Sequence, residues 1–101
     1  MKHSSIRYKI YAFGSPLLEK LNSHKHARKI CRDLDETEEI LEVFWIKSEE
    51  LGEEMNISFL PTIIVLNLKN VEIGRVFGKG VTSENIYGII ESDISCRNAS
   101  K

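Results

Sequence analysis

The chain has 101 residues, which is enough for a single domain with one hydrophobic core. Apolar residues make up 42% of it and only six glycines and two prolines occur, a composition that excludes disordered, collagen-like and disulfide-scaffold proteins. The net charge of −1 provides no overall field for binding nucleic acid or a membrane.

The first third of the chain predicts a strand followed by a helix. Residues 6–13 are rich in β-branched and aromatic side chains, which favour a strand. Gly14-Ser15-Pro16 follows and ends the strand. A helix is expected to start there, because serine is a good helix N-cap and proline suits the first helical position. We predict a helix from Pro16 to about Leu34, followed by a polar break that reaches Glu39. Its buried stripe repeats at helical spacing and comprises Ala27, Ile30, Cys31 and Leu34.

Two strands and a short helix are predicted in the middle of the chain. Residues 40–46 are almost continuously apolar, which is typical of a strand covered on both faces. We expect Ser48 to cap a short helix that buries Leu51 and Met55. Residues 62–66 predict the third strand.

A hairpin and a last helix complete the predicted elements. Lys69-Asn70 turns the chain, and residues 71–77 return as an edge-like strand. We expect one side of this strand to carry Val71, Ile73 and Phe77 and the other Glu72 and Arg75. Thr82 or Ser83 caps the final helix, whose apolar positions are Ile86, Ile89, Ile90 and Ile94. Residues 95–101 are expected to form a frayed polar tail.

The order β-α-β-α-β-β-α predicts one domain over residues 1–101, with its core at about 6–94. The first β-α-β unit requires two parallel strands, and the hairpin adds antiparallel ones. The fold class is therefore α/β, a four-stranded mixed sheet between helices in a three-layer α/β/α arrangement.

Phe59-Leu60-Pro61-Thr62, which opens the third strand, resembles the thioredoxin-like superfamily. There a hydrophobic residue precedes a cis-proline, and an apolar strand and hairpin follow. The resemblance therefore implies a cis bond before Pro61, at the first residue of a strand, where proline is tolerated. Redox members carry Cys-x-x-Cys after the first strand, and residues 14–20 of this chain contain no cysteine. The resemblance is thus to members without thiol chemistry.

Within this superfamily, residues 9–16 are similar to the opening strand of the circadian clock protein KaiB, and residues 75–78 and 83–90 resemble its Arg-x-x-Gly segment and last helix. The KaiB family binds proteins: its members dock on a RecA-like ATPase, and a related domain is the sensor of a histidine kinase. The resemblance implies a regulatory role, with an ATPase or a kinase as partner.

The two cysteines and the histidines indicate no cofactor or metal. Cys31 lies on the apolar stripe and is expected to be a small buried side chain, whereas Cys96 lies in the tail as an exposed thiol. A thiol–disulfide oxidoreductase that works through a lone cysteine is the alternative function. His24 and His26 point to different faces of one helix, so they cannot share a metal ion.

Charge is segregated along the chain. Residues 1–32 have a net charge of +7 and residues 33–54 of −9. This is typical of solvated helix faces that differ in sign, and the alternative is a dipolar surface that orients a charged partner. The basic segment carries no interleaved aromatic side chains for base stacking, so nucleic acid is not an expected partner.

We predict a non-catalytic interaction module that binds a protein through loops at one end of the sheet. The expected binding residues are Ser15, Leu18, Phe59, Leu60, Pro61 and Lys79. The acidic segment Glu49–Glu54 is the competing surface. No apolar run approaches the roughly 18 residues of a spanning helix and no secretory signal is recognisable, so we expect a cytoplasmic protein without a membrane partner. The oligomeric state is left open.

Overall fold

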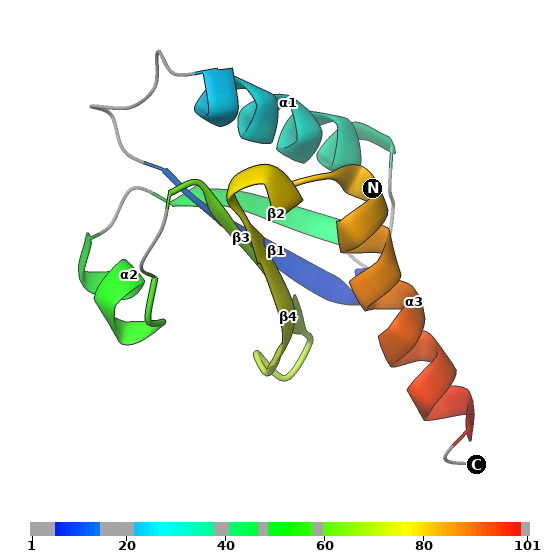
Figure 1. Ribbon diagram of the computed structural model, residues 1–101. Helices are drawn as coiled ribbons and strands as arrows, with labels where there is room; N and C mark the ends of the chain where they lie inside the picture. Colours follow the sequence, from blue (N-terminus) through cyan, green and yellow to red (C-terminus); the bar gives the residue numbers. More distant parts are fainter. Residues whose placement is uncertain (1–5, 15–21, 38–40, 47–48, 58–59, 100–101) are drawn as a thin grey trace.

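The computed structural model describes residues 6–14, 22–37, 41–46, 49–57 and 60–99 (Figure 1). Its elements follow the predicted order, with a 3₁₀ turn added at Gly78–Gly80. The strands are β1 (Tyr8–Phe13), β2 (Leu41–Ile46), β3 (Thr62–Asn67) and β4 (Glu72–Phe77), and the helices are α1 (Asn22–Thr37), α2 (Glu49–Glu54) and α3 (Ser83–Ala99).

The four strands form one mixed sheet in the order β2-β1-β3-β4. β1 pairs parallel with β2 and antiparallel with β3, and β4 joins β3 antiparallel. β2 and β4 are therefore the two edge strands. The predicted fold class is confirmed.

The period of two along each strand divides the core between the two faces of the sheet. On one face, Ile10 and Ala12 belong to the larger cluster, into which α1 contributes Ala27 and α3 contributes Ile86. The opposite face carries a smaller cluster of buried residues, Phe13, Ile64 and Leu66. Met55 and Ile57, which follow α2, pack against that second cluster. The sheet thus lies between α1 and α3 on one side and the α2 segment on the other.

A β-bulge in β4 corrects the predicted alternation of that strand. Val65 pairs with Gly74, but the next residue of β3 pairs with Glu72, so Ile73 is an extra residue on β4. Ile73 packs against the larger cluster, on the side of α1 and α3. Phe77 lies on the opposite side together with Arg75, whereas the sequence predicted it beside Ile73. The period of two fails here because the bulge changes which face the following residues occupy.

Both long helices end later than predicted. α1 continues to Thr37 through the predicted polar break, and α3 continues to Ala99 in place of a tail frayed from residue 95. Neither extension contains glycine or proline, so nothing in it interrupts the helical hydrogen bonds. The Thr82 hydroxyl caps α3 by accepting a hydrogen bond from the Asn85 N–H at 3.1 Å. The predicted helix start at Pro16 and the cap at Ser48 lie outside the described residues.

No helix in the described part of the chain is both long enough and apolar enough to cross a bilayer.

Candidate functional site

The described parts of two predicted binding loops, at residues 60–62 and 77–79, lie at one end of the sheet, where β1 ends and β3 begins. Phe13 pairs with Thr62, which pairs with Phe77 on β4, so the three residues form a row across the sheet. Leu60, Pro61, Phe77, Gly78 and Lys79 lie at or just beyond this row, and we call these five residues the rim. Three further predicted binding residues, Ser15, Leu18 and Phe59, lie outside the described residues.

The rim combines a buried proline with two exposed apolar side chains. The Leu60–Pro61 peptide bond is cis, and the Pro61 carbonyl accepts a hydrogen bond from the Gly78 N–H at 3.3 Å. Pro61 itself is fully buried, whereas Leu60 is 39% exposed and Phe77 50% exposed. Burial of such exposed apolar side chains by a partner is favourable, and interfaces concentrate their binding energy in a few residues. The rim therefore offers an apolar anchor with a fixed backbone.

Lys79 projects from the 3₁₀ turn beside this anchor. The turn is closed by hydrogen bonds from Val81 N–H to the Gly78 carbonyl at 3.3 Å and from Thr82 N–H to the Gly80 carbonyl at 2.9 Å. Gly78 has a φ of 57°, in the left-handed region that other residues rarely adopt. Lys79 is exposed and makes no hydrogen bond or ion pair with the described residues. Its ammonium is thus available to an acidic group of a partner.

Phe77 is the rim residue that the sequence placed on the wrong side of β4. Its side chain lies on the side of Arg75 and not of Ile73, because the bulge at Ile73 interrupts the alternation along β4. A glycine inside a strand pattern is the one signal of a bulge that a sequence offers, and Gly74 supplies it here.

Gly14, which directly follows β1, lies against the indole of Trp45, the single tryptophan, at the same end of the sheet. Its N–H donates to the Ile46 carbonyl at 3.2 Å. A Cβ at this position would lie 2.3 Å from Cζ2 of Trp45, so only glycine lets the indole pack there. The indole also makes a cation–π contact with the Arg28 guanidinium, whose Cζ lies 5.3 Å from the ring centroid. Trp45, predicted in the core, packs partly buried against the larger cluster.

Neither cysteine lies at the rim. Cys31 is buried in α1 at 6% exposure, and this burial raises the pKa of its thiol to about 12, an effect that the nearby Arg28 charge only partly opposes. The thiol is therefore protonated at neutral pH, and a protonated thiol is a poor nucleophile. Cys96 is exposed near the end of α3, in agreement with its predicted exposure.

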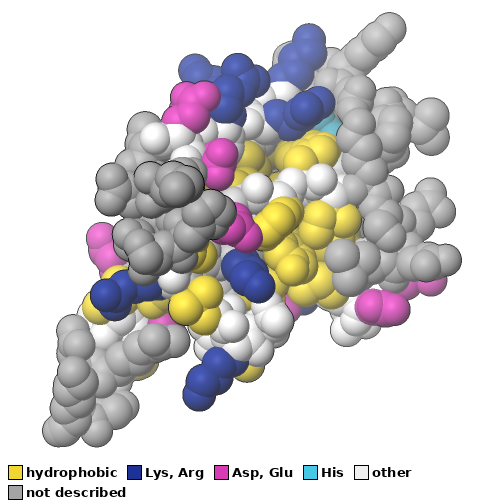
Figure 2. Space-filling view, turned by 180° about the vertical axis from the view of Figure 1, so that it is seen from behind, with side chains coloured by type: hydrophobic (Ala, Val, Ile, Leu, Met, Phe, Trp, Pro, Cys, Tyr) yellow, Lys and Arg dark blue, Asp and Glu magenta, His cyan; other side chains and the backbone are white. Residues whose placement is uncertain are grey.

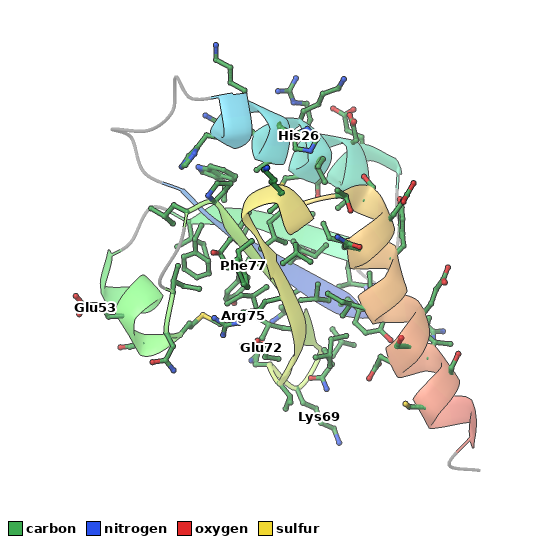
Figure 3. All side chains as sticks on the ribbon, viewed as in Figure 1. His26, Glu53, Lys69, Glu72, Arg75 and Phe77 are labelled. Atoms are coloured by element: carbon green, nitrogen blue, oxygen red, sulfur yellow. The ribbon has the colours of Figure 1, made fainter. Side chains whose placement is uncertain are left out.

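The histidines do not form a metal site with each other. His24 is buried among the core residues, whereas Nε2 of His26 lies 3.0 Å from the Val81 carbonyl (Figure 3). A carbonyl oxygen can only accept, so Nε2 donates this hydrogen bond, which links α1 to the segment before α3. In the part of the chain that the structure describes, no three metal-ligating side chains gather.

A second exposed apolar surface lies on β1 and β2. Tyr11 and Phe44 pack edge to face, with ring centroids 5.5 Å apart and planes at 87°. Phe44 remains exposed. Figure 2 shows hydrophobic side chains gathered over this part of the sheet, below the Lys and Arg side chains of α1.

Comparisons with known proteins give a fold and no family. No protein-family model matches the chain, and no curated protein matches it. Solved structures do match: thioredoxin 1 of Thermosipho africanus has a TM-score of 0.66 at 23% identity and covers 89% of this chain and 98% of its own. The chain has the thioredoxin fold.

Two further thioredoxins agree with this assignment. Oxidised thioredoxin from Plasmodium falciparum has a TM-score of 0.66 at 17% identity, over 88% of this chain and 83% of its own. The germline-specific thioredoxin Deadhead of Drosophila melanogaster has a TM-score of 0.67 at 16% identity, over 90% and 85%. At these identities the likeness extends to the thioredoxin fold and not to an activity.

Proposed function

We propose that this chain is a non-catalytic protein-interaction module of the thioredoxin fold, with a regulatory role like that of KaiB-related domains. The main support for this is the composition of the rim, where Leu60 and Phe77 are exposed and the exposed Lys79 adds a positive charge. A mixed apolar and charged surface on a fixed backbone suits a protein partner better than a small substrate.

The chemistry of the cysteines supports the non-catalytic part of this proposal. Thiol–disulfide exchange needs a thiolate and, in the two-cysteine mechanism, a second thiol to resolve the mixed disulfide. The only cysteines of the chain are Cys31 and Cys96, 65 positions apart in sequence, and the first is buried with a raised pKa. A redox role would have to rest on Cys96, the exposed thiol, which makes a lone-cysteine oxidoreductase the alternative.

The partner class follows from the resemblance rather than from the rim alone. KaiB-like domains dock on an ATPase or serve a histidine kinase, and we propose a partner of either kind for this chain. The charge of Lys79 favours an acidic residue on that partner, next to an apolar pocket that receives Leu60 or Phe77.

Site-specific photo-cross-linking in the native cell tests this proposal. A photoreactive residue replaces Lys79 in one variant and Lys69 in the other, since both lysines are exposed and Lys69 lies on the hairpin at the other end of β4 (Figure 3). We expect one protein, identified by mass spectrometry, to be captured from position 79 and not from position 69. Equal capture at both positions would contradict a binding site at the rim.

The captured partner then allows a quantitative comparison. Leu60→Ala and Leu68→Ala are a matched pair, because both leucines are exposed and only Leu60 belongs to the rim. Leu60→Ala should weaken binding of the purified partner about five- to thirtyfold, and Leu68→Ala should not. The opposite order would place the interface on the hairpin.

A further inference from the structure

A groove lies along α3 where this helix packs on the edge strand β4, away from the rim. Figure 1 shows α3 running beside β4 and continuing past the sheet, so its last turns have no strand beneath them. The groove has a cavity volume of about 690 Å³. Its lining includes Ile73 of β4 and, from α3, Glu84, Gly88, Ile89, Asp93 and Cys96.

Three features of the sequence shape this groove and make its base apolar. The bulge turns Ile73 toward the α3 side of the sheet. At Gly74 a Cβ would lie 2.9 Å from Ile89, so the glycine lets the isoleucine pack directly on the strand. At Gly88 a Cβ would meet nothing within 4 Å, so this side of the helix borders empty space. The base is therefore formed by two half-buried isoleucines.

Two carboxylates stand along the groove, and one is held in place by a buried side chain. The Tyr8 hydroxyl donates a hydrogen bond to Oδ2 of Asp93 at 2.7 Å, and Tyr8 is only 2% exposed. Glu84 is exposed and makes no hydrogen bond or ion pair with the described residues. Asp93 follows Glu84 by nine positions, which corresponds to about 13.5 Å along the helix axis and half a turn around it, so the two carboxylates border the groove on opposite sides and toward opposite ends. An extended chain spans this axial distance with about four residues.

We propose that this groove binds an extended segment of another protein that carries a basic residue toward each end and aliphatic residues between them. The aliphatic side chains cover Ile73 and Ile89, and the two cations meet Glu84 and Asp93. Because β4 is an edge strand, such a segment lies beside backbone groups that β3 does not pair. This surface is separate from the rim and does not depend on the function proposed for it.

Charge argues against a second copy of this chain that docks through its own α3. α3 of the copy would bring its own Glu84, Glu91 and Asp93 toward the same groove. Like charges brought together in an interface oppose association, whereas a cationic segment gains from the same field.

Fluorescence anisotropy with a labelled heptapeptide tests the proposal. The probe is Gly-Lys-Val-Thr-Val-Lys-Gly, and the control probe has glutamate in place of both lysines. We expect saturable binding of the lysine peptide and none of the glutamate peptide. The variant Glu84→Gln/Asp93→Asn should weaken binding at least about tenfold, since asparagine keeps the acceptor for Tyr8 but loses the charge. Absence of saturable binding to the wild type would overturn the proposal.

Matched variants separate the groove from a general attraction of cations. Glu91→Gln makes the same change of charge on an exposed position of α3 that does not line the groove, and it should bind the peptide as the wild type does. Gly88→Leu fills the open side and should weaken binding without a change of charge. If Glu91→Gln weakens binding as much as the double variant, the attraction is non-specific and the proposal is wrong.

Alkylation of Cys96 gives a second readout that does not depend on a fluorophore. This thiol lines the groove and is exposed, whereas Cys31 is buried. Saturating lysine peptide should slow the reaction of iodoacetamide with Cys96 several-fold, and Leu60→Ala should not alter that protection. An unchanged alkylation rate would show that the peptide binds elsewhere and would overturn the proposal. Sedimentation tests the other occupant: dimers formed by Glu84→Gln would make a second copy of this chain the occupant instead.

Discussion

The Arg75 guanidinium donates two hydrogen bonds to the Glu72 carboxylate, although the two residues are three positions apart on one strand. Nε donates to Oε2 at 2.7 Å and Nη2 to Oε1 at 2.5 Å. On a regular strand, residues i and i+3 point to opposite faces. The bulge at Ile73 between them brings both side chains to the same face, as Figure 3 shows. The same guanidinium also donates to the carbonyls of Met55 and Asn56, at 3.0 and 3.2 Å, and so joins β4 to the end of α2.

Arg75→Ala removes all four of these hydrogen bonds at once. We expect the free energy of unfolding to fall by about 1–3 kcal/mol, as for hydrogen bonds that involve a charged group. Arg75→Lys keeps the charge but not the planar fork, and should recover only part of the loss. Urea titration followed by circular dichroism measures both, with Lys69→Ala as an exposed control. A value for Arg75→Ala within about 0.5 kcal/mol of the wild type would contradict the role of this contact.

Gly14→Ala tests the packing of Trp45. The new methyl group would overlap the indole, so we expect a loss of about 1–3 kcal/mol in unfolding free energy. Trp45 is the only tryptophan, and its emission spectrum should shift in the folded variant. Gly88→Ala is the matched control, since its methyl group meets open space on a helix and should stabilise the protein by up to about 1 kcal/mol. Equal effects of the two substitutions would refute the assigned contact.

Cys31 should make the protein less stable at alkaline pH. Burial raises the pKa of this thiol to about 12 in the folded state, from 9.0 in its ordinary setting. The folded thiol therefore keeps its proton while the unfolded one loses it, and stability falls as pH rises from 9 toward 12, by at most about 1.4 kcal/mol per pH unit. Cys31→Ala should flatten the dependence measured by urea titration between pH 9 and 11, and Cys96→Ala should not. An identical slope in the wild type and Cys31→Ala would disprove the shift.

The strands were predictable because the sequence of each strand shows the run of apolar and β-branched side chains that is typical of a buried strand. β3 is buried from Thr62 to Leu66, as its unbroken apolar run indicates, and Thr82 caps α3 as its residue type suggests. The pairing of Arg75 with Glu72 was not predictable, because it depends on the bulge, and the bulge depends on how β4 registers against β3. Phe77 was misplaced for the same reason. Of the predicted binding residues, the structure places Leu60, Pro61 and Lys79 at one end of the sheet, and their role in binding stays a prediction.

The salt dependence of partner binding distinguishes the rim from the acidic surface of α2. Binding through Leu60 and Phe77 should weaken only slightly as ionic strength rises, whereas binding through α2 should weaken steeply, because salt screens exposed charges. Lys79→Glu should cost about 1–2 kcal/mol at low salt, and Glu53→Lys on α2 should cost nothing. Isothermal titration with the captured partner measures both. Loss of binding in Glu53→Lys with normal binding in Lys79→Glu would move the site to α2.

We expect this thioredoxin fold to work without thiol chemistry, and the decisive assay is the reduction of insulin disulfides by dithiothreitol. The rate with wild-type protein should equal the rate with dithiothreitol alone, and it should be unchanged by Cys31→Ser and by Cys96→Ser. Circular dichroism confirms beforehand that each variant is folded. A rate above this background that disappears in Cys96→Ser, or in Cys31→Ser, would establish a lone-cysteine oxidoreductase and rule out a non-catalytic module.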